Sequence, residues 1–297
     1  MIAAAILPRV SIIVPAYNEA ERIDDCVQSL LNQSYPSDLL QIIIVDNGSR
    51  DGTFERLRQI PGILALQEPR PGSYAARNYA LKHATGDVVC FTDADCIADV
   101  NWVRNAIRHL GDINVGVVAG HVELDFMRAG RLSSSELFEK CFSFKQAENA
   151  RNNVCVTANW CSSRSLLDRM GGFDGTARSG GDHRLAARIA AAGYRIVYAP
   201  DAIVRHPARA CFDDLTRKRR RVIGGAWLSQ CRIAGKPFAR FVASLFKETL
   251  QRLRAIFTRL PLPHADRLRL SALLLFLCGV SVAEAVRLQL GGEPRRQ

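Results

Sequence analysis

Residues 10–18 read VSIIVPAYN, an apolar and β-branched run that ends abruptly in polar residues. A second such run, QIIIV at 41–45, stops at Asp46, and a third, VVCF at 88–91, stops at TDADC. Near-continuous apolar runs of this length are typical of strands buried on both faces of a parallel sheet. Helical spacing of apolar residues separates these strands, over residues 19–33, 54–59 and 73–83. The alternation predicts an α/β fold with a mostly parallel sheet covered by helices.

Polar residues stand where each predicted strand ends. Tyr17 follows the first strand, Asp46 follows the second, and Asp93 and Asp95 follow the strand at 88–91. Parallel α/β sheets bind their ligands just outside the carboxyl ends of the strands. We therefore expect these four residues to share one crevice, although they lie far apart in the sequence.

The carboxylate pair in TDADC has three interpretations. Carboxylate oxygens at Asp93 and Asp95 suit Mg²⁺, which typically takes one or two protein carboxylates together with phosphate oxygens and water. Phosphatases that use an aspartate nucleophile also place such a pair after an apolar strand. The third interpretation is a surface turn without chemical function. The triplet alone does not decide between them.

The middle of the chain predicts a helix at 133–148 and further strands at 116–123, 153–160 and 195–199. The sequence SGGD at 179–182 then precedes a helix over 183–192. A glycine pair lets the backbone make a tight approach, and it places Asp182 at or near a helix N-terminus. Asp182 is therefore either a helix cap or a functional carboxylate, and the spacing leaves both open.

Charge is distributed unevenly along the 297 residues. The net charge is +11, yet residues 1–204 hold 21 Lys and Arg against 23 Asp and Glu. Residues 205–297 hold 19 against 6, so the last third carries the whole excess. This asymmetry indicates a near-neutral catalytic or binding domain with a basic appendage that meets phosphates of lipid, nucleic acid or a nucleotide.

Three segments characterise this basic region, which we place at 213–297 after a first domain at 1–212. The run RKRRR at 217–221 alone indicates a solvated face or a nucleic-acid arm. Residues 238–260 predict a basic amphipathic helix, which suits a membrane surface or a partner helix. Residues 270–283 carry no charge. They span roughly 21 Å as a helix, against the ~30 Å of a hydrocarbon core. We expect an interfacial or partly embedded helix, or one that packs on the first domain.

The nine cysteines show no C-x-x-C pair and no histidine close enough to complete a zinc pattern. Reduced and mostly buried thiols are therefore expected, as in a cytoplasmic protein. The N-terminal sequence MIAAAILPRV has no positive charge ahead of its short apolar stretch. It is a poor match to a signal peptide.

Five motifs taken together resemble a known family. They are VSIIVPAYNEAERI, IIIVDNGSRDGT, GSYAARNYAL, GDVVCFTDADC and the series GGFD, GGD and RIAAAGYRI, in that order. Together they resemble the inverting glycosyltransferases of family 2, over roughly residues 8–225. The resemblance implies the GT-A (Rossmann-like) fold and transfer of a sugar from a nucleotide-sugar to a hydroxyl acceptor. The processive Q-x-x-R-W motif is absent from the sequence, which favours addition of single sugars.

The resemblance also implies roles for individual residues. Asp95 would hold Mg²⁺ or Mn²⁺, and Asp93 would contact the ribose or the metal. Arg77 would offset the charge of the diphosphate, and Asp182 would be the general base. The base and ribose of the nucleotide would meet Pro15, Ala16, Tyr17, Glu19 and Asp46. Acceptor or lid contacts would come from Asn159, Trp160, His206, Arg217 and Arg221.

The partners implied are a nucleotide-sugar, most simply a UDP-sugar, and a glycan or lipid-linked acceptor. Because the basic region lacks regular aromatic interleaving, an anionic membrane surface is the expected partner and nucleic acid is not. We expect peripheral attachment to the inner face of the cell membrane. The alternatives are a D-x-D phosphatase, a nucleotidyltransferase, or a membrane- or nucleic-acid-binding protein with a degenerate nucleotide site.

Overall fold

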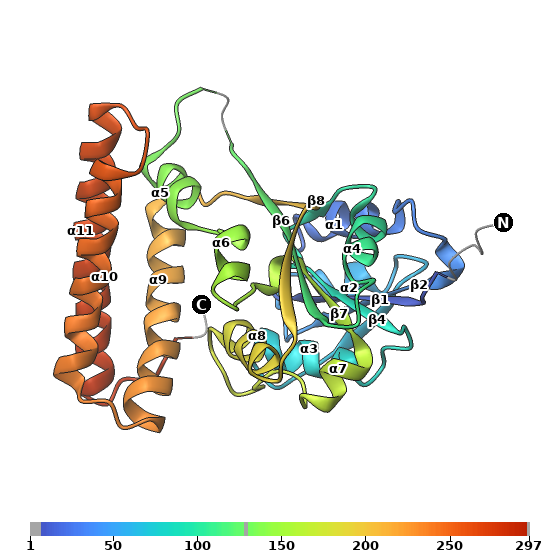
Figure 1. Ribbon diagram of the computed structural model, residues 1–297. Coiled ribbons are helices and arrows are strands. Elements are labelled where there is room, and N and C mark those ends of the chain that lie inside the picture. The colour runs from blue at the N-terminus through green and yellow to red at the C-terminus, as the bar shows by residue number, and fades with distance from the viewer. Residues whose placement is uncertain (1–6, 128–129, 296–297) are drawn as a thin grey trace. The chain divides into compact units, whose positions relative to one another are not determined.

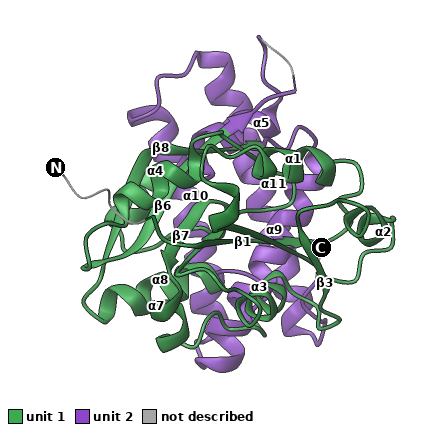
Figure 2. Ribbon diagram, turned by 90° about the vertical axis from the view of Figure 1, so that its right-hand side faces the viewer, with its two compact units in different colours: residues 1–123, 145–176, 181–206 green, residues 124–144, 177–180, 207–297 purple. Residues whose placement is uncertain are grey.

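The structure is a computed structural model that describes residues 7–127 and 130–295. The chain forms two compact units, which Figure 2 distinguishes by colour. Unit 1 comprises the chain up to Glu123, Lys145–Thr176 and Gly181–His206. Unit 2 comprises Leu124–Phe144, Ala177–Gly180 and the chain from Pro207 onward. The chain therefore leaves and re-enters unit 1 twice before its last segment completes unit 2.

One half of the sheet in unit 1 is parallel (Figure 1). Its strands are β1 Val10–Ala16, β2 Leu40–Asp46, β3 Leu64–Gln67 and β4 Val88–Phe91. β1 pairs in parallel with both β2 and β4, and β2 pairs in parallel with β3. Every residue of β4 is buried, and β1 is buried except at Pro15. Burial on both faces is the reason that these strands are almost continuously apolar.

The other half of the sheet is antiparallel. β7 Trp160–Ser163 pairs antiparallel with β4 and with β6 Val115–Asp125. β5 Ile97–Ala98 pairs antiparallel with β8 Arg195–Pro207. The order is β3-β2-β1-β4-β7-β6-β8-β5. The predicted α/β fold is confirmed, and its sheet is mixed, with the parallel strands at one end.

Helices of unit 1 pack on this sheet through amphipathic faces. α1 Ile23–Leu31 shows the pattern most simply, because its buried residues Ile23, Cys26, Val27 and Leu30 follow helical spacing and join the core beneath β1 and β2. The others are α2 Thr53–Leu57, α3 Ser73–Leu81, α4 Trp102–His109, α6 Gln146–Arg151, α7 Arg164–Arg169 and α8 Gly181–Ala191. Short 3₁₀ turns lie at Ser37–Leu39 and Thr157–Asn159.

Two predictions for the middle of the chain are wrong. The helix expected at 133–148 is two helices, α5 Ser134–Phe142 and α6, because Phe144 between them has φ of 50°, outside the helical range. The strand expected at 153–160 is a loop and a 3₁₀ turn, and pairing begins only at Trp160. Asn153 has φ of 56°, which no strand residue adopts.

Unit 2 is built around four helices, of which the last three are long. They are α5, α9 Phe212–Trp227, α10 Phe238–Thr258 and α11 His264–Gln289, with a π-helical turn η3 at Leu228–Ile233. α11 packs against α5, α9 and α10. Leu270, Leu273, Leu274 and Leu277 of α11 fill one core cluster, and Ala285 and Leu288 join a second. Ser133 and Glu136 form a capping box at the start of α5, which fixes where that helix begins.

α11 extends well beyond the uncharged residues 270–283. It has 26 residues with a mean hydropathy of 1.8 over its most apolar part, so by length and composition it is long enough to cross a membrane. However, 44% of that part is buried inside the protein. A buried core helix passes the same test of length and composition. The packing on α5, α9 and α10 gives α11 protein partners within its own unit.

The basic run at 217–221 lies in α9 and is not a uniform solvated face. Lys218 Nζ lies 2.8 Å from Glu139 Oε1, and Arg219 Nη2 lies 3.2 Å from Glu248 Oε2. Both acceptors belong to other helices of unit 2. Two adjacent cations of the run therefore hold helices together, and the interpretation as an arm is wrong for these two residues.

Candidate active site

Asp93 and Asp95 follow β4 in a turn at the carboxyl edge of the sheet. The Thr92 N–H donates to Ile13 O and extends the pairing with β1 by one residue, and the Cys96 N–H then donates to Asp93 O to close the turn. The side chain of Asp93 is 34% exposed and that of Asp95 is 16% exposed. Two carboxylates are thus presented at the edge where the crevice was predicted.

Arg77 of α3 provides the cation beside Asp93. Its Nη2 lies 2.5 Å from Asp93 Oδ1, and its side chain is only 2% exposed. Its Nε is buried and has no hydrogen-bond partner among the residues that the structure describes. A buried guanidinium N–H normally has an acceptor. Arg77 therefore has spare donor capacity for an anionic ligand at this edge.

His206 near the end of β8 faces the second carboxylate. Its Nε2 lies 3.4 Å from Asp95 Oδ2, and the ring is almost fully buried. These atoms and Cys96 Sγ all lie within 4.8 Å of one another. Burial, reinforced by Asp95, raises the pKa of Cys96 well above its usual range, so this thiol is neutral. The carboxylate and the imidazole are the groups of this cluster suited to a divalent cation.

The pKa of Glu19, in the loop after β1, is shifted by its surroundings at the same edge. Burial together with the charges of Asp95 and Asp93 raises the pKa of Glu19 to about 7. Burial is the larger cause, and the neighbouring carboxylates add to it more than the nearby Arg22 offsets. The edge therefore has an excess of negative charge, which a bound cation would relieve.

The remaining predicted nucleotide contacts follow β1 and β2. Ala16 is buried, whereas Pro15 and Tyr17 are half-buried. Asp46 is fully buried, and its carboxylate accepts the N–H groups of Gly48 and Ser49 at 3.2–3.3 Å. Asp46 therefore shapes the turn after β2, in which Gly48 has φ of 77°. Its predicted contact with a base stays a prediction.

Asp182 lies in the first turn of α8 and not at its cap. Its Oδ1 accepts the Tyr74 hydroxyl at 2.9 Å and the His183 N–H at 2.9 Å. Its Oδ2 accepts the Thr157 N–H at 3.4 Å. The side chain is nearly buried, at 9% exposure for the residue. Asp182 is thus a carboxylate held by three donors from three segments.

The structure gives Asn159 and Trp160 structural partners. The Asn159 amide donates to His121 O and Ala202 O and accepts the Trp102 indole N–H. The Trp160 indole N–H donates to Ser162 Oγ, and the ring is fully buried. Both side chains are buried and tie neighbouring segments together, and their predicted contact with the acceptor stays a prediction.

Arg217 and Arg221 belong to α9 of unit 2. Arg217 forms an ion pair with Asp214 one turn earlier, and Arg221 donates to the carbonyl of Arg178. Their predicted contact with the diphosphate stays a prediction.

Sequence reasoning missed one residue of the site, Tyr74. It lies one helical turn before Arg77 on α3, so the two side chains share a face of that helix. The three-residue spacing between Tyr74 and Arg77 on a predicted helix is the sequence feature that could have identified Tyr74. His206 lies beside Asp95, a neighbour that the sequence did not indicate, and its predicted place in a lid stays a prediction.

Comparisons with known proteins agree with this geometry. The family described as glycosyl transferase family 2 matches residues 11–171, more than half of the chain. The glycosyltransferase AglE of Haloferax volcanii is 33% identical over 222 residues, which cover 73% of this chain and 72% of that protein. The probable glycosyltransferase YdaM of Bacillus subtilis is 28% identical over 266 residues, which cover 84% of this chain and 60% of that protein.

A solved structure supports the fold. The mannosyltransferase PcManGT of Pyrobaculum calidifontis, in complex with GDP-Man and Mn²⁺, superposes with a TM-score of 0.60 at 24% identity, covering 98% of this chain and 78% of that one. The extent of the family match and the similarity to AglE show that the chain belongs to glycosyl transferase family 2.

Proposed function

We propose that the protein moves a single sugar from a nucleotide-sugar to a hydroxyl group of a glycan or lipid-linked acceptor, with inversion at the anomeric carbon. The observation that carries the proposal is the arrangement at one sheet edge of unit 1. Asp93 is paired with Arg77, Asp95 faces His206, and Asp182 is held separately by Tyr74. This separation suits a reaction in which leaving-group charge and proton removal are handled by different groups.

A divalent cation, Mg²⁺ or Mn²⁺, fits the first of these groups. Asp95 and His206 would hold it, and Asp93 would contact it or the ribose of the donor. Burial, together with the charges of Asp95 and Asp93, raises the pKa of Glu19, and a cation here would offset those charges. When bound, such an ion stabilises negative charge on the oxygens of a departing diphosphate.

Arg77 and the loops after β1 and β2 would bind the donor. The unpartnered Nε of Arg77 offers a charge-assisted hydrogen bond to a diphosphate oxygen. The segment Pro15–Tyr17 and the buried Asp46 frame the space expected for the base and ribose. We propose a UDP-sugar as donor, and a GDP-sugar is the alternative that the screen described below separates.

Asp182 would act as the general base. As the acceptor oxygen bonds to the anomeric carbon, its proton passes to the Asp182 carboxylate, and the electron pair of the broken C–O bond leaves with the diphosphate. A direct displacement of this kind inverts the anomeric configuration.

Two measurements test this proposal. Thermal unfolding with Mn²⁺ and a panel of sugar nucleotides should show stabilisation by one donor class, because stabilisation follows affinity for the folded state. Asp182→Asn should lower transfer by about 10²–10⁴-fold while that stabilisation survives. Asp168→Asn, at an exposed carboxylate on α7, is the matched control. Near-normal turnover in Asp182→Asn would refute the base assignment.

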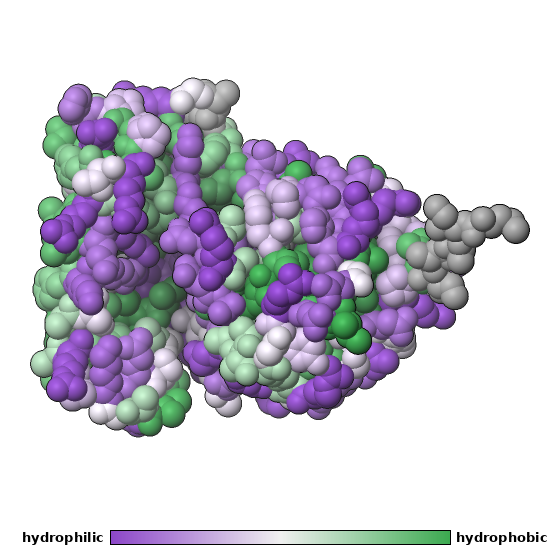
Figure 3. Space-filling model, in the orientation of Figure 1, coloured by the Kyte–Doolittle hydropathy of each residue, from purple (hydrophilic) through white to green (hydrophobic). Residues whose placement is uncertain are grey.

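We further propose that unit 2 attaches the enzyme to the anionic inner face of the cell membrane. Large apolar side chains are more than half exposed on α10 and α11: Phe246, Leu250, Phe257, Leu268, Leu275 and Phe276. We call these residues the α10–α11 face. Hydrophobic and hydrophilic residues alternate over the visible side of these helices in Figure 3. Exposed apolar area of this extent on one pair of helices is typical of an interaction surface.

The charges around the α10–α11 face suit anionic lipid. Arg240, Lys247 and Arg254 are exposed at seven-residue spacing, so they lie along one line of α10. The carboxylates are engaged elsewhere, since Glu248 pairs with Arg219 and Arg252, and Glu284 pairs with Arg287. Cations beside exposed apolar side chains favour a membrane surface over a neutral partner.

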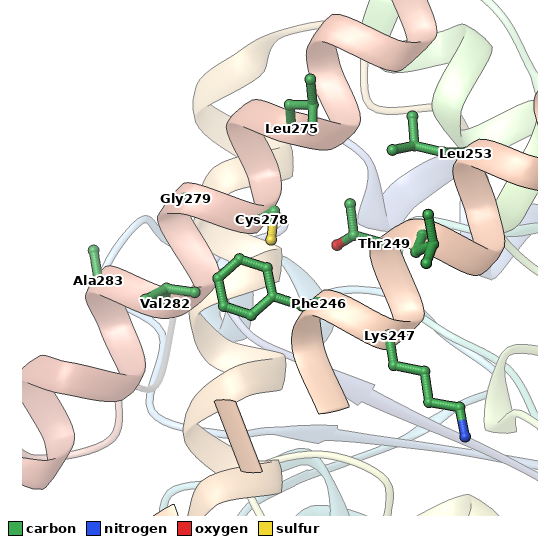
Figure 4. Close-up of a pocket in the computed structure, with 10 residues that line it drawn as sticks. Phe246, Lys247, Thr249, Leu253, Leu275, Cys278, Gly279, Val282 and Ala283 are labelled. Carbon is green, nitrogen blue, oxygen red and sulfur yellow. The ribbon is translucent and has the colours of Figure 1, made fainter. Parts of the chain in front are cut away.

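A groove between α10 and α11 adds an apolar cleft to this face. It has a volume of about 820 Å³ and is lined by Phe246, Thr249, Leu250, Leu253, Leu275 and Val282 among others. Figure 4 shows Phe246 turned toward Cys278 and Val282, with the Lys247 amine extending away from the groove. Sedimentation with vesicles of anionic lipid should remove the protein from solution, and 0.5–1 M salt should release part of it, because salt screens exposed charge. Equal binding to uncharged vesicles would refute the electrostatic part.

A further inference from the structure

Tyr74 occupies an unusual position for a residue outside the predicted site. It is 6% exposed, and its hydroxyl donates to Asp182 Oδ1 at 2.9 Å across 108 positions of sequence. Burial, reinforced by the Asp182 charge, raises the pKa of Tyr74. The hydroxyl therefore stays protonated and acts as the donor in this bond.

The ring of Tyr74 is fixed on two sides. It stacks on Phe173 with 5.5 Å between centroids and 27° between planes. On another side it lies against Gly181, where an added Cβ would come within 2.8–3.0 Å of three ring atoms. Such distances exclude any side chain larger than hydrogen at Gly181 unless the ring moves. Gly181 therefore provides the space through which Tyr74 reaches Asp182.

The hydrogen bonds of Asp182 distinguish its two oxygens. Oδ1 accepts both the Tyr74 hydroxyl and the His183 N–H at 2.9 Å, which engages both of its lone pairs. Among the residues that the structure describes, Oδ2 accepts a single hydrogen bond, from the Thr157 N–H, and that bond is long at 3.4 Å. The oxygen with free accepting capacity is therefore Oδ2.

We propose that Tyr74 is a positioning residue for the general base, and that Gly181 is the space that allows it. Tyr74 fixes the rotation of the Asp182 carboxylate and leaves Oδ2 to take the proton of the acceptor hydroxyl. This inference rests on the proposed function, in which Asp182 is the base. A donated hydrogen bond favours the charged form of a carboxylate, because it stabilises negative charge on oxygen.

Helix α3 carries both the residue that contacts the proposed base and the residue that contacts Asp93. Arg77, three residues after Tyr74, places its guanidinium 5.8 Å from the centre of the Tyr74 ring and contacts Asp93 with its Nη2. The ring, and not the hydroxyl, makes the contact with Arg77. Removing the hydroxyl alone should therefore alter the base and leave donor binding intact.

Tyr74→Phe is the decisive variant. Turnover should fall roughly ten- to hundredfold, the value of one hydrogen bond to a charged group. The acid limb of the kcat/KM profile should move to higher pH, since the carboxylate loses a donor. The KM for the sugar nucleotide should stay unchanged. Tyr79→Phe, at a half-buried tyrosine of the same helix, is the matched control and should change none of these.

Gly181 provides an independent variant. Gly181→Ala should reproduce the losses of Tyr74→Phe, because the added methyl group displaces the Tyr74 ring. In a protein that already carries Tyr74→Ala, Gly181→Ala should lower turnover much less, because there is no ring for the methyl group to clash with. Thermal unfolding with Mn²⁺ and the donor verifies that each variant folds and binds. An unshifted pH profile and normal turnover in Tyr74→Phe would overturn the inference. Normal turnover in Asp182→Asn would instead overturn the proposed function.

Discussion

Two glutamates of this protein, one in each unit, show opposite electrostatics. Glu139 of α5 is completely buried, and although burial alone raises the pKa of a carboxyl, Lys218 and Arg209 outweigh it and lower the pKa to about 2. Glu19 is only half-buried, yet burial and the neighbouring charges of Asp95 and Asp93 raise its pKa to about 7. The deeper group is the better stabilised.

The opposite pKa shifts distinguish carboxylates that stabilise the fold from carboxylates at a binding site. In unit 2 the buried carboxylates of Glu139 and Glu284 have their own cations, since Glu139 contacts Arg209 and Lys218, and Glu284 contacts Arg287. The buried Glu136 instead accepts the N–H groups of Met127 and Ser133. In unit 1 Asp93 is paired with Arg77 and Asp95 faces His206, whereas at Glu19 the nearby Arg22 does not outweigh burial and the charges of Asp95 and Asp93. Structural ion pairs also perturb pKa values, so the direction of the shift matters more than its size. A cluster that pushes a carboxyl pKa upward is the stronger indication of a binding site.

The largest effect should come from breaking the compensated group. Glu139→Gln leaves Lys218 and Arg209 without their carboxylate, and removing one partner of a buried ion pair typically costs about 3–5 kcal/mol. Because the folded pKa lies below the unfolded one, the stabilisation is present above about pH 4.5 in the unchanged protein and is lost as pH falls toward 2. Denaturant unfolding at pH 7 and pH 3 measures both effects.

Asp213→Asn is the control for this variant. Asp213 is exposed in the first turn of α9, where a surface substitution should change stability by no more than about 0.5 kcal/mol. Equal losses in the two variants would mean that Glu139 is no better compensated than a surface acid, and the contrast with Glu19 would fail.

The second largest effect should come from removing a carboxylate at the sheet edge of unit 1. Asp95→Ala should abolish the stabilisation that Mn²⁺ and a sugar nucleotide give, about 2.7 kcal/mol at a hundredfold excess over the dissociation constant. Calorimetric titration should show the same loss as an absence of metal-dependent heat. Asp25→Ala, at an exposed carboxylate of α1, should retain both signals. Unchanged heat in Asp95→Ala would remove Asp95 from the cation site.

The sequence allowed the uncompensated site to be predicted better than the compensated one. Strand ends are readable from apolar runs, so the gathering of Asp46, Asp93 and Asp95 at one edge followed from local patterns and the rule for parallel sheets. Ion pairs such as Lys218 with Glu139 join helices 79 positions apart, and nothing local encodes them. The run at 217–221 therefore looked like a solvated face.

Features in the middle of the chain that the sequence did not reveal have the same origin. Asn159 and Trp160 form hydrogen bonds to His121, Ala202 and Ser162 that only the folded sheet creates. The break between α5 and α6 rests on the positive φ of Phe144, a conformation that phenylalanine rarely adopts and that apolar spacing cannot reveal. Tertiary contacts overrode local preference at these positions.

A third, smaller effect should appear at Glu19 when metal is removed. Its folded pKa of about 7 exceeds the unfolded value of 4.5, so its contribution to stability is fully present below about pH 4.5 and is lost as pH rises through 7. In EDTA, Glu19→Gln should therefore be more stable than the unchanged protein at pH 8, by about 1–2 kcal/mol after allowing for solvent screening.

Two comparisons sharpen this result. Glu21→Gln, at an exposed carboxylate two residues away, should show no such gain with pH. Saturating Mn²⁺ should reduce the gain in Glu19→Gln, because a cation at Asp95 offsets the repulsion that raises the pKa. A gain that is equal in EDTA and in Mn²⁺ would show that the negative charge at this edge is unrelated to metal.

The smallest effect should come from replacing exposed cations of α10 in unit 2. Lys247→Gln and Arg254→Gln should each weaken binding to vesicles of anionic lipid by about 1 kcal/mol, the value of one basic side chain near a charged surface. They should leave stability unchanged, because exposed cations of α10 support no core contact. The fold-change in the partition coefficient between vesicles and solution measures the first effect.

Lys82→Gln is the matched control, because Lys82 is an exposed lysine of unit 1 and the net charge changes equally. If charge on the α10–α11 face is what binds lipid, Lys82→Gln should bind as tightly as the unchanged protein, and the losses in Lys247→Gln and Arg254→Gln should vanish in high salt. Equal losses in all three variants would mean that total charge, and not this face, governs attachment. In that case Lys218 and Arg219 would still stabilise unit 2 through their carboxylates, but Lys247 and Arg254 would have no specific role in membrane attachment.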